Sequence, residues 1–314
     1  MEALTPWQLT AYLDRIGYNG PTQPTLETLQ QIHLAHLLTV PFENLDIHWG
    51  RPIRLERDPL FQKIVVERRG GFCFELNSLL AAALMRLGYS VQLLSGQVSR
   101  ADGSLGPEFD HLALQVVLDD QAWLVDVGYG DSFRQPLRFG DPQIQSQEQG
   151  CYRCVPGSEE RDPSPFSPRY WLVQQEQRCS VPLTRTDQTW KTLFRVDRMP
   201  RQLQEFEPMC RFHQTSPESM FTRLRLCTLA TPAGRITLTA RANGSAAFKW
   251  IETTAAGRRE RTLKDEREYR QLLSQAFGIQ LPPKQDSDYS PFGPVRSNSR
   301  KPRQGNVTIG SDVS

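Results

Sequence analysis

The 314-residue sequence has little excess charge, few cysteines and no long apolar run. Its 37 basic and 35 acidic side chains leave a formal net charge of +2, so the charge balance points neither to nucleic acid nor to an anionic membrane as a partner. No stretch of about 18 apolar residues is present that would span a membrane. The first residues, MEALTPWQLTAYLDRIGY, lack the basic and then apolar order of a signal peptide. We therefore expect a cytoplasmic protein.

The six cysteines are spread irregularly over the sequence, which is typical of a protein from a reducing compartment rather than of a disulfide framework. The string CYRC at 151–154 has the spacing of a zinc or redox pair. However, no second such pair and no suitably spaced histidine follow it. We interpret this string as ordinary loop sequence and expect no metal site.

Three compositional blocks and a tail divide the chain. Residues 1–88 have helical periodicity and predict a helical bundle, and in residues 89–200 the apolar period changes to two, which predicts strands. Residues 201–282 mix strands with a helix at about 264–276. The tail, 283–314, is rich in serine, proline, glycine and basic residues, and we expect it to be disordered. The order of these blocks indicates an α+β protein.

Individual elements follow from the same patterns. Thr5-Pro6 is a cap and first-turn pair that predicts the start of a first helix, and Leu26 opens the apolar stripe of a second. Period-two segments predict strands at 90–98, 111–118, 122–128, 169–175, 221–229, 234–240 and 246–251.

Cys73 stands between a glycine pair and an apolar helical repeat. From Leu76 to Leu87 the apolar residues recur at intervals of three and four, and Gly88 is a natural C-terminal stop. We therefore expect Cys73 in or just before the first turn of a helix, where the positive end of the helix dipole favours a thiolate. The alternative is a small buried residue that packs under the helix.

A thiolate nucleophile needs a base, and the sequence offers five histidines. His33 and His36 lie on the apolar face of a predicted helix, where we expect core residues. Neither His48 nor His213 has a partner that the sequence identifies. His111 differs, because it opens the strand HLALQVVL.

The parity of two strands brings an acid to this histidine. If Asp119 and Asp120 form a two-residue hairpin loop, Leu114 pairs with Val125 and the apolar faces coincide. Asp126 then lies diagonal to His111 on the same face, about 7–8 Å away at the backbone. A four-residue loop keeps the face but increases this separation. The alternative to a His111–Asp126 pair is that Asp126 is a carboxylate at a strand end that faces solvent.

Cys73, His111 and Asp126 thus form a candidate Cys-His-Asp triad, and at this point the sequence resembles the arylamine N-acetyltransferases. Five motifs carry the resemblance in the family's order: PFENLD (41–46), RGGFCFELN (69–77), DHLALQV (110–116), WLVDVGYG (123–130) and TSPESMF (215–221). The resemblance implies an N-terminal helical bundle, a central β-barrel and a C-terminal α/β lid around a cysteine-proteinase-like core. We expect the bundle at 1–88, the barrel at 89–200 and the lid at 201–282.

The resemblance also implies an activity, with an acetyl group passing from acetyl-CoA to Cys73 and then to a small aromatic amine or hydrazine. His111 would be the base and Asp126 would orient it. Such acceptors are typical of xenobiotic metabolism. No cofactor would be bound permanently, since acetyl-CoA is a co-substrate.

Binding residues are expected on the same grounds. Thr215, Ser216 and Ser219 would lie near the coenzyme A thioester. The arylamine pocket would be bordered by Phe72, Gly128, Tyr129 and Gly130.

Two alternatives remain open at the level of sequence. A cysteine hydrolase or transglutaminase-like enzyme has the same order of Cys, His and acid, with water or lysine as the acceptor. An inactive relative could act as a scaffold, although all three triad positions are intact.

The loop before Cys73 raises two further expectations. Glu43 and either Arg68 or Arg69 could form a buried ion pair that holds the loop, instead of being unrelated surface charges. Gly70 and Gly71 do not form a nucleotide loop, because no GK[ST] follows, and we expect them to let the backbone approach the thioester.

The composition of the tail generates a prediction. Removal of residues 285–314 should leave turnover and the cooperativity of unfolding unchanged, because this segment has too little apolar surface to join a core. Activity assays and thermal unfolding of the truncated chain measure both quantities. A truncated chain that aggregates or loses turnover would contradict this prediction.

Overall fold

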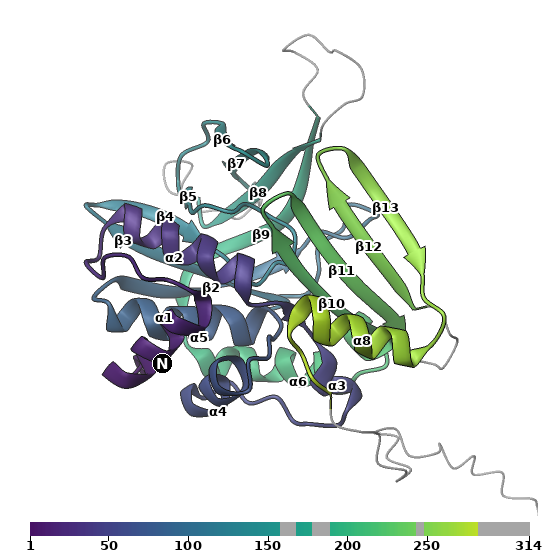
Figure 1. Cartoon of the computed structure of the whole chain (residues 1–314). Coiled ribbons are helices and arrows are strands. Elements are labelled where there is room, and N and C mark those ends of the chain that lie inside the picture. The colour runs from purple at the N-terminus through teal and green to yellow at the C-terminus, as the bar shows by residue number, and fades with distance from the viewer. Residues whose placement is uncertain (158–167, 178–188, 243–247, 282–314) are drawn as a thin grey trace, which may run out of the picture. The chain divides into compact units, whose positions relative to one another are not determined.

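The computed structural model describes residues 1–157, 168–177, 189–242 and 248–281, all of which belong to one unit, Met1–Pro282. Helices occupy the N-terminal part of this unit and strands follow (Figure 1). The expected disorder of the tail 283–314 concerns a segment outside the described residues.

The N-terminal part is helical, as its periodicity predicts. Its elements are α1 (Pro6–Ile16), α2 (Leu26–Thr39), the two-residue strand β1 (Phe42–Glu43), α3 (Leu45–His48), α4 (Arg57–Phe61), a π-helical turn (Gln62–Val66) and α5 (Cys73–Arg86). The predicted start of the first helix is confirmed, since Thr5 and Gln8 form a capping box and Pro6 follows the cap. The left-handed Gly17 ends this helix with a φ of 69°.

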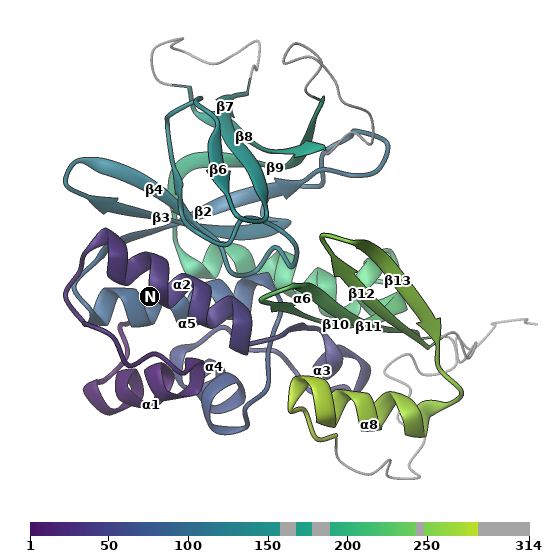
Figure 2. The same ribbon diagram turned by 45° about the horizontal axis from the view of Figure 1, so that its top comes forward.

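A curved antiparallel sheet follows the helices. Its strands, all within the described residues, are β2 (Ser90–Val98), β3 (His111–Leu118), β4 (Gln121–Val125), β5 (Leu137–Arg138), β6 (Gln145–Gln147), β7 (Gly150–Pro156), β8 (Tyr170–Gln177) and β9 (Thr189–Arg201). Their order is β5-β4-β3-β2-β9-β8-β7-β6. Since β5 also contacts β7, the sheet closes into a nearly complete barrel (Figure 2).

The predicted hairpin between β3 and β4 is confirmed. Leu114 is paired with Val125, as the parity argument requires. The connecting residues Asp119 and Asp120 both have positive φ, at 48° and 60°, which is the backbone of a type I′ two-residue turn. This turn fixes the register and therefore the positions of the residues that flank the hairpin.

The two faces of this hairpin pack against different cores. Leu112, Leu114 and Val116 join the cluster of the helices, where α5 lies against β2 and β3. Ala113 and Leu124 face the other way into the barrel interior. One side of the hairpin is thus covered by α5, and the other side lines the barrel.

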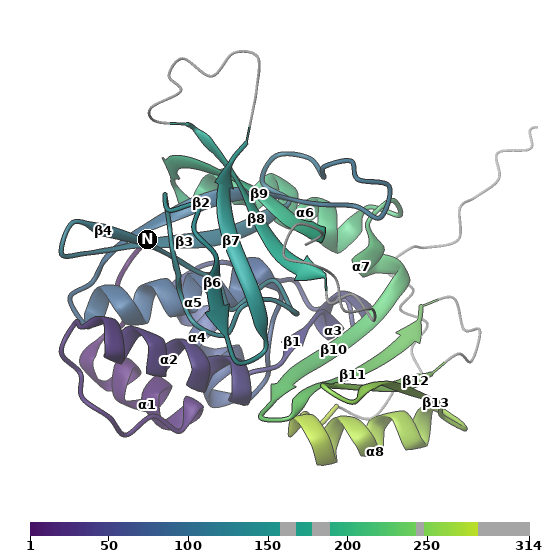
Figure 3. The ribbon, with the colours of Figure 1, turned by 90° about the horizontal axis from the view of Figure 1, so that it is seen from above.

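The C-terminal part contains a second sheet, ordered β1-β10-β11-β12-β13. Its elements are a 3-10 turn (Leu203–Phe206), α6 (Glu207–Thr215), α7 (Met220–Arg223), β10 (Leu224–Thr231), β11 (Gly234–Arg241), β12 (Lys249–Thr254), β13 (Gly257–Thr262) and α8 (Glu266–Phe277). Helix α8 covers one face of this sheet (Figure 3). Phe206 and Cys210 pack with the N-terminal helices instead.

Some predicted elements are wrong in their bounds or type. The strand expected at 221–229 begins only at Leu224, because Ser219 caps a helical turn just before it. The string CYRC lies in β7 and is not loop sequence. Strand β13 was not expected because all six of its side chains are exposed, so GRRERT has no apolar alternation.

The described residues contain neither a membrane-spanning helix nor a cluster of metal-ligand residues. No helix there combines the length and apolarity that a membrane crossing needs. Within the same ranges, no three or more His, Cys, Asp or Glu side chains come together in a group that could hold a metal ion.

The glycine pair before Cys73 has a packing role in this structure. A Cβ atom at Gly70 would lie 1.9 Å from the backbone oxygen of Pro41, and one at Gly71 would lie 2.7 Å from Cβ of Glu75. The close approach that these glycines permit is therefore to the chain at Pro41 and to the Glu75 side chain.

We predict that Gly70→Ala lowers the free energy of unfolding by about 3 kcal/mol, because the clashing partner is backbone and cannot rotate away. Gly103→Ala is the control. It adds a Cβ with no atom within 4 Å, in a left-handed turn, so only about 1 kcal/mol of backbone strain is expected. Urea unfolding of both variants measures the difference, and equal losses would contradict the role given to Gly70.

Candidate active site

The nucleophile candidate stands at the first residue of α5, as predicted. Phe72 is the N-cap and Cys73 the first helical residue, so the thiol lies beside N–H groups that have no intrahelical acceptor. Cys73 is 4% exposed. Gly128 packs against it so closely that a Cβ at that position would lie 2.6 Å from Cα of Cys73.

Three other cysteines, Cys154, Cys210 and Cys227, are poor nucleophiles. Burial raises the pKa of Cys154 to about 12, and it also raises the pKa of Cys210 and Cys227. Since the thiolate is the reactive form, these residues stay as unreactive thiols at neutral pH.

His111 and Asp126 meet as the hairpin register predicts. Nε2 of His111 lies 2.7 Å from Oδ2 of Asp126, and both side chains are buried. Since Nε2 faces the carboxylate, Nδ1 is the ring nitrogen left for the thiol. The rings of Tyr129 and Phe194 pack against the imidazole.

The electrostatics of this group favour a charged imidazole. Burial lowers the pKa of His111, but the Asp126 carboxylate and the hydrogen bonds with Asp126 and Cys73 outweigh it and raise that pKa to about 10. Such a base stays protonated at neutral pH, and the arrangement suits a thiolate and imidazolium pair.

The Asp126 carboxylate is held by further donors. Its Oδ1 accepts hydrogen bonds from Nδ2 of Asn77 and from the N–H of Gly128, each at 2.8 Å. Burial acts to raise the pKa of Asp126, but His111, Asn77 and Gly128 together hold it below its usual range. Asp126 therefore remains an anion next to the imidazole.

Asn77 and His33 support this acid and were not among the predicted site residues. Oδ1 of Asn77 accepts the N–H of Val127 at 3.0 Å, so Asn77 ties α5 to the segment after β4. Its place four residues after Cys73, on the same helix face, was a signal for it. His33, expected as a core residue, is buried with Nε2 3.0 Å from the backbone oxygen of Asp126. No spacing in the sequence indicates that contact.

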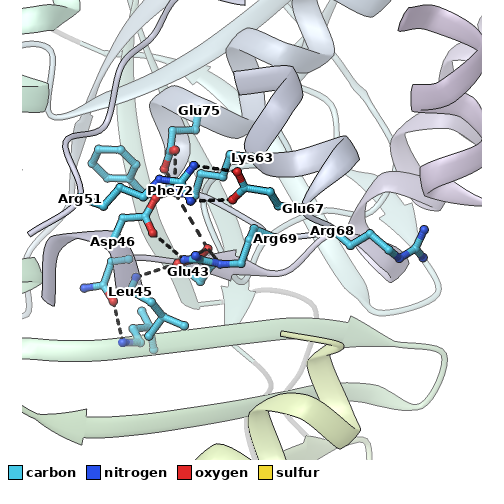
Figure 4. Close-up of polar contacts among 12 residues, drawn as sticks. Glu43, Leu45, Asp46, Arg51, Lys63, Glu67, Arg68, Arg69, Phe72 and Glu75 are labelled. Atoms are coloured by element: carbon cyan, nitrogen blue, oxygen red, sulfur yellow. Dashed lines mark hydrogen bonds and ion pairs between the residues drawn. The ribbon is translucent and has the colours of Figure 1, made fainter. Parts of the chain in front are cut away.

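A buried ion-pair cluster lies near Phe72, the residue before Cys73 (Figure 4). The predicted ion pair with Glu43 is formed by Arg69, whose Nη2 lies 2.8 Å from Oε1 of Glu43. Arg68 is exposed and does not form it. Arg69 also pairs with Asp46 at 2.9 Å. The cluster consists of Glu43, Asp46, Lys63, Arg69 and Glu75, and it holds the loop that precedes Cys73. Asp46, Lys63 and Glu75 were not predicted as its members.

The residues predicted for the acceptor pocket surround the triad to different extents. Tyr129, whose ring packs against His111, and Gly130 are partly exposed, and Gly128 is buried against Cys73. Phe72 is fully buried, and its ring packs against Phe74 and other aromatic rings.

The residues predicted near coenzyme A differ in accessibility. Thr215 is exposed and Ser216 partly exposed. Ser219 is 2% exposed, and its hydroxyl lies 3.1 Å from Nδ1 of His213 and caps α7. Its hydroxyl is thus already used, which disfavours direct contact with a ligand. His213, for which the sequence identified no partner, also lies 3.2 Å from Asp110.

The chain is similar to known N-acetyltransferases. A family model described as N-acetyltransferase matches residues 25–286. Over 235 residues the chain is 35% identical to the arylamine N-acetyltransferase pineal gland isozyme NAT-3 of Gallus gallus, an alignment that covers 71% of this chain and 78% of that protein.

Solved structures show the same similarity. The arylamine N-acetyltransferase of Salmonella typhimurium has a TM-score of 0.73 at 30% identity, covering 88% of this chain and 92% of that one. The arylamine N-acetyltransferase of Mycobacterium marinum in complex with CoA has a TM-score of 0.72 at 28% identity, covering 86% and 92%.

The geometry predicts how His111 titrates. In the wild type its imidazole should stay protonated from about pH 6 to about pH 8, because its pKa is raised to about 10. Asp126→Asn removes the supporting charge, so burial should dominate and lower the pKa below about 6. Side-chain NMR of nitrogen-15-labelled histidine reports both states.

Asp119→Asn, in the exposed hairpin turn, is the matched control and should leave the titration unchanged. A His111 that stays protonated at neutral pH in Asp126→Asn would contradict the assigned cause.

Proposed function

The chain belongs to the arylamine N-acetyltransferase family, and on that premise we propose that Cys73, His111 and Asp126 are its catalytic residues. The protein transfers an acetyl group from acetyl-CoA, a co-substrate and not a permanently bound cofactor, to an arylamine. The observation that carries the residue assignment is the buried His111–Asp126 pair, with Nε2 and Oδ2 2.7 Å apart, together with a cysteine at the start of a helix.

In the first step His111 holds the proton of Cys73, and the thiolate attacks the carbonyl carbon of acetyl-CoA. A bond forms between this carbon and the Cys73 sulfur, the bond to the coenzyme A sulfur breaks, and His111 returns the proton to the leaving thiolate. The N–H groups at the start of α5 are suitable donors to the oxyanion of the tetrahedral intermediate. Acetyl-cysteine and free coenzyme A result.

In the second step the amine nitrogen attacks the acetyl-cysteine. The new carbon–nitrogen bond replaces the bond to sulfur, and the proton lost by nitrogen returns to the Cys73–His111 pair. An aromatic amine or hydrazine suits this step because it is largely unprotonated at neutral pH. We extend the acceptor class to arylhydrazines on this ground.

Binding roles follow from accessibility. Tyr129, whose ring packs against His111, and Gly130, both partly exposed, are proposed to border the arylamine, with the buried Phe72 and Gly128 as packing residues. Thr215 and Ser216 are proposed to lie near coenzyme A, and Ser219 supports them by capping α7.

We also propose a division of labour between the parts of the chain. Residues 1–88 supply the nucleophile, residues 89–200 the base and its orienting acid, and residues 201–282 a lid over the co-substrate. The protein is proposed to act in the cytoplasm, since all five described cysteines are free, as in a reducing compartment.

Stopped-flow measurement of coenzyme A release without amine tests the residue roles. Cys73→Ser should abolish the burst. Asp126→Asn should slow it by about 10³-fold or more, because the neutral amide favours the wrong tautomer and cannot balance the imidazolium. Asp119→Asn should keep the wild-type burst.

A burst that survives in Cys73→Ser would refute the nucleophile. An Asp126→Asn variant with the wild-type burst and a defect only in amine acetylation would assign Asp126 to the acceptor pocket instead.

A further inference from the structure

Five charged side chains are buried beneath the first turn of α5, and the catalytic steps described above use none of them (Figure 4). They are Glu43, Asp46, Lys63, Arg69 and Glu75, and none is more than 6% exposed. Three carboxylates face two basic groups, so one negative charge is in excess. Burying ions costs several kcal/mol each, which makes stability alone a poor reason for this arrangement.

Glu75 joins this cluster to the backbone at the nucleophile. Its Oε1 accepts a hydrogen bond from Nζ of Lys63 at 2.7 Å, and its Oε2 accepts the N–H of Phe72 at 3.1 Å. Phe72 is the N-cap residue, directly before Cys73. The side chain also packs on Gly71, where a Cβ would lie 2.8 Å from Oε2.

We propose that Glu75 is a positioning residue for acetyl loading: its carboxylate, held by Lys63, fixes the Phe72 N–H and so the backbone that presents Cys73 to the thioester. This inference rests on the proposed role of Cys73 as nucleophile. Glu75 acts through Phe72 and does not touch the reacting atoms in this scheme.

The two hydrogen bonds require an ionised carboxylate, because each oxygen accepts from a different donor. A proton on Oε1 would face the Lys63 ammonium, and a proton on Oε2 would face the Phe72 N–H. Protonation therefore removes one of the two bonds. The rate of loading should follow the ionisation of Glu75.

The surroundings set where that ionisation occurs. Lys63 faces Glu75 from the π-helical turn, Asp46 from α3 and Glu43 from β1. Burial raises the pKa of Glu75, Lys63 lowers it, and Asp46 and Glu43 raise it, with a result of about 7.

Other charged groups lie further out. Arg69 pairs with Glu43 and Asp46, and Cys210 of α6, whose raised pKa keeps it neutral, interacts with Glu75. A cavity of about 220 Å³, lined also by Arg51 and Arg54, borders Glu75.

His111 and Asp126 do not titrate in this range. The pKa of His111 is raised to about 10, and that of Asp126 is held below its usual range. Loading by the wild type should therefore rise from about pH 6 to about pH 8 as Glu75 ionises.

Glu75→Gln is the first test, with the stopped-flow release of coenzyme A by the full chain as the readout. The introduced amide can accept at one oxygen only and presents a donor to either Lys63 or Phe72. We expect loading about tenfold slower than the wild type at pH 8, and without the rise across neutral pH.

The double variant Lys63→Gln with Glu75→Gln restores complementary bonds without charge. In this variant the amide at position 75 should accept the Phe72 N–H and donate to the amide oxygen at position 63. The NH₂ group at position 63 should donate to Asp46, which lies 3.0 Å from Nζ of Lys63 in the wild type. The excess charge of the cluster is unchanged. Loading should recover to within about threefold of the wild type and remain independent of pH near 7.

Glu67→Gln is the matched control. Glu67 is a partly exposed residue that pairs with Arg51 at 2.6 Å outside the cluster. This variant should keep both the wild-type rate and the wild-type pH profile.

The proposal is overturned if Glu75→Gln loads at the wild-type rate with the wild-type rise in pH. It is also overturned if loading by the double variant still rises from about pH 6 to about pH 8. This second outcome is the test if the single variant does not fold. A wild-type protein that is never acetylated on Cys73 would refute the proposed function. If the wild type is acetylated and the Glu75 variants load at the same rate with the same pH dependence, only this inference is refuted.

Discussion

The buried carboxylate of Asp126, which lies 2.7 Å from His111 and also accepts a hydrogen bond from Asn77, connects the barrel to the helices. His111 and Asp126 flank the hairpin of β3 and β4, whose tight turn sets their register. The acid is held in turn by Asn77 from α5, and its backbone oxygen lies beside His33 of α2. Bundle and barrel therefore meet at this acid, and its ionised state depends on both.

The start of α5 is constrained from two sides. On one side lie His111, the proposed base, and Asp126, and Gly128 lets the chain approach Cys73 closely. On the other side the charged cluster around Lys63 and Arg69 holds the loop that leads into the helix. Because a Cβ added at Gly70, Gly71 or Gly128 would collide with its neighbours, the backbone around Cys73 is tightly packed from both sides.

The features that the sequence predicted are those that depend on local periodicity. The beginning of α5 at Cys73 and the hairpin register that brings Asp126 to His111 both follow from spacing along one or two neighbouring elements. The exposed strand β13 escaped prediction because it has no apolar face.

The contacts that were missed join residues far apart in the chain. Lys63 and Glu75 are separated by 12 positions and meet only because the π-helical turn packs against α5. His33 and Asp126 are 93 positions apart. No periodicity within a single element encodes such pairs, since they depend on how complete layers pack together.

Peptide mapping by mass spectrometry, after the protein is mixed with acetyl-CoA in the absence of an amine, tests the central claim most directly. We predict a single acetyl group on the peptide that contains Cys73, and its loss when an arylamine is added. An acetyl group on another residue, or acetylation of the amine without any acetylated protein, would contradict this account.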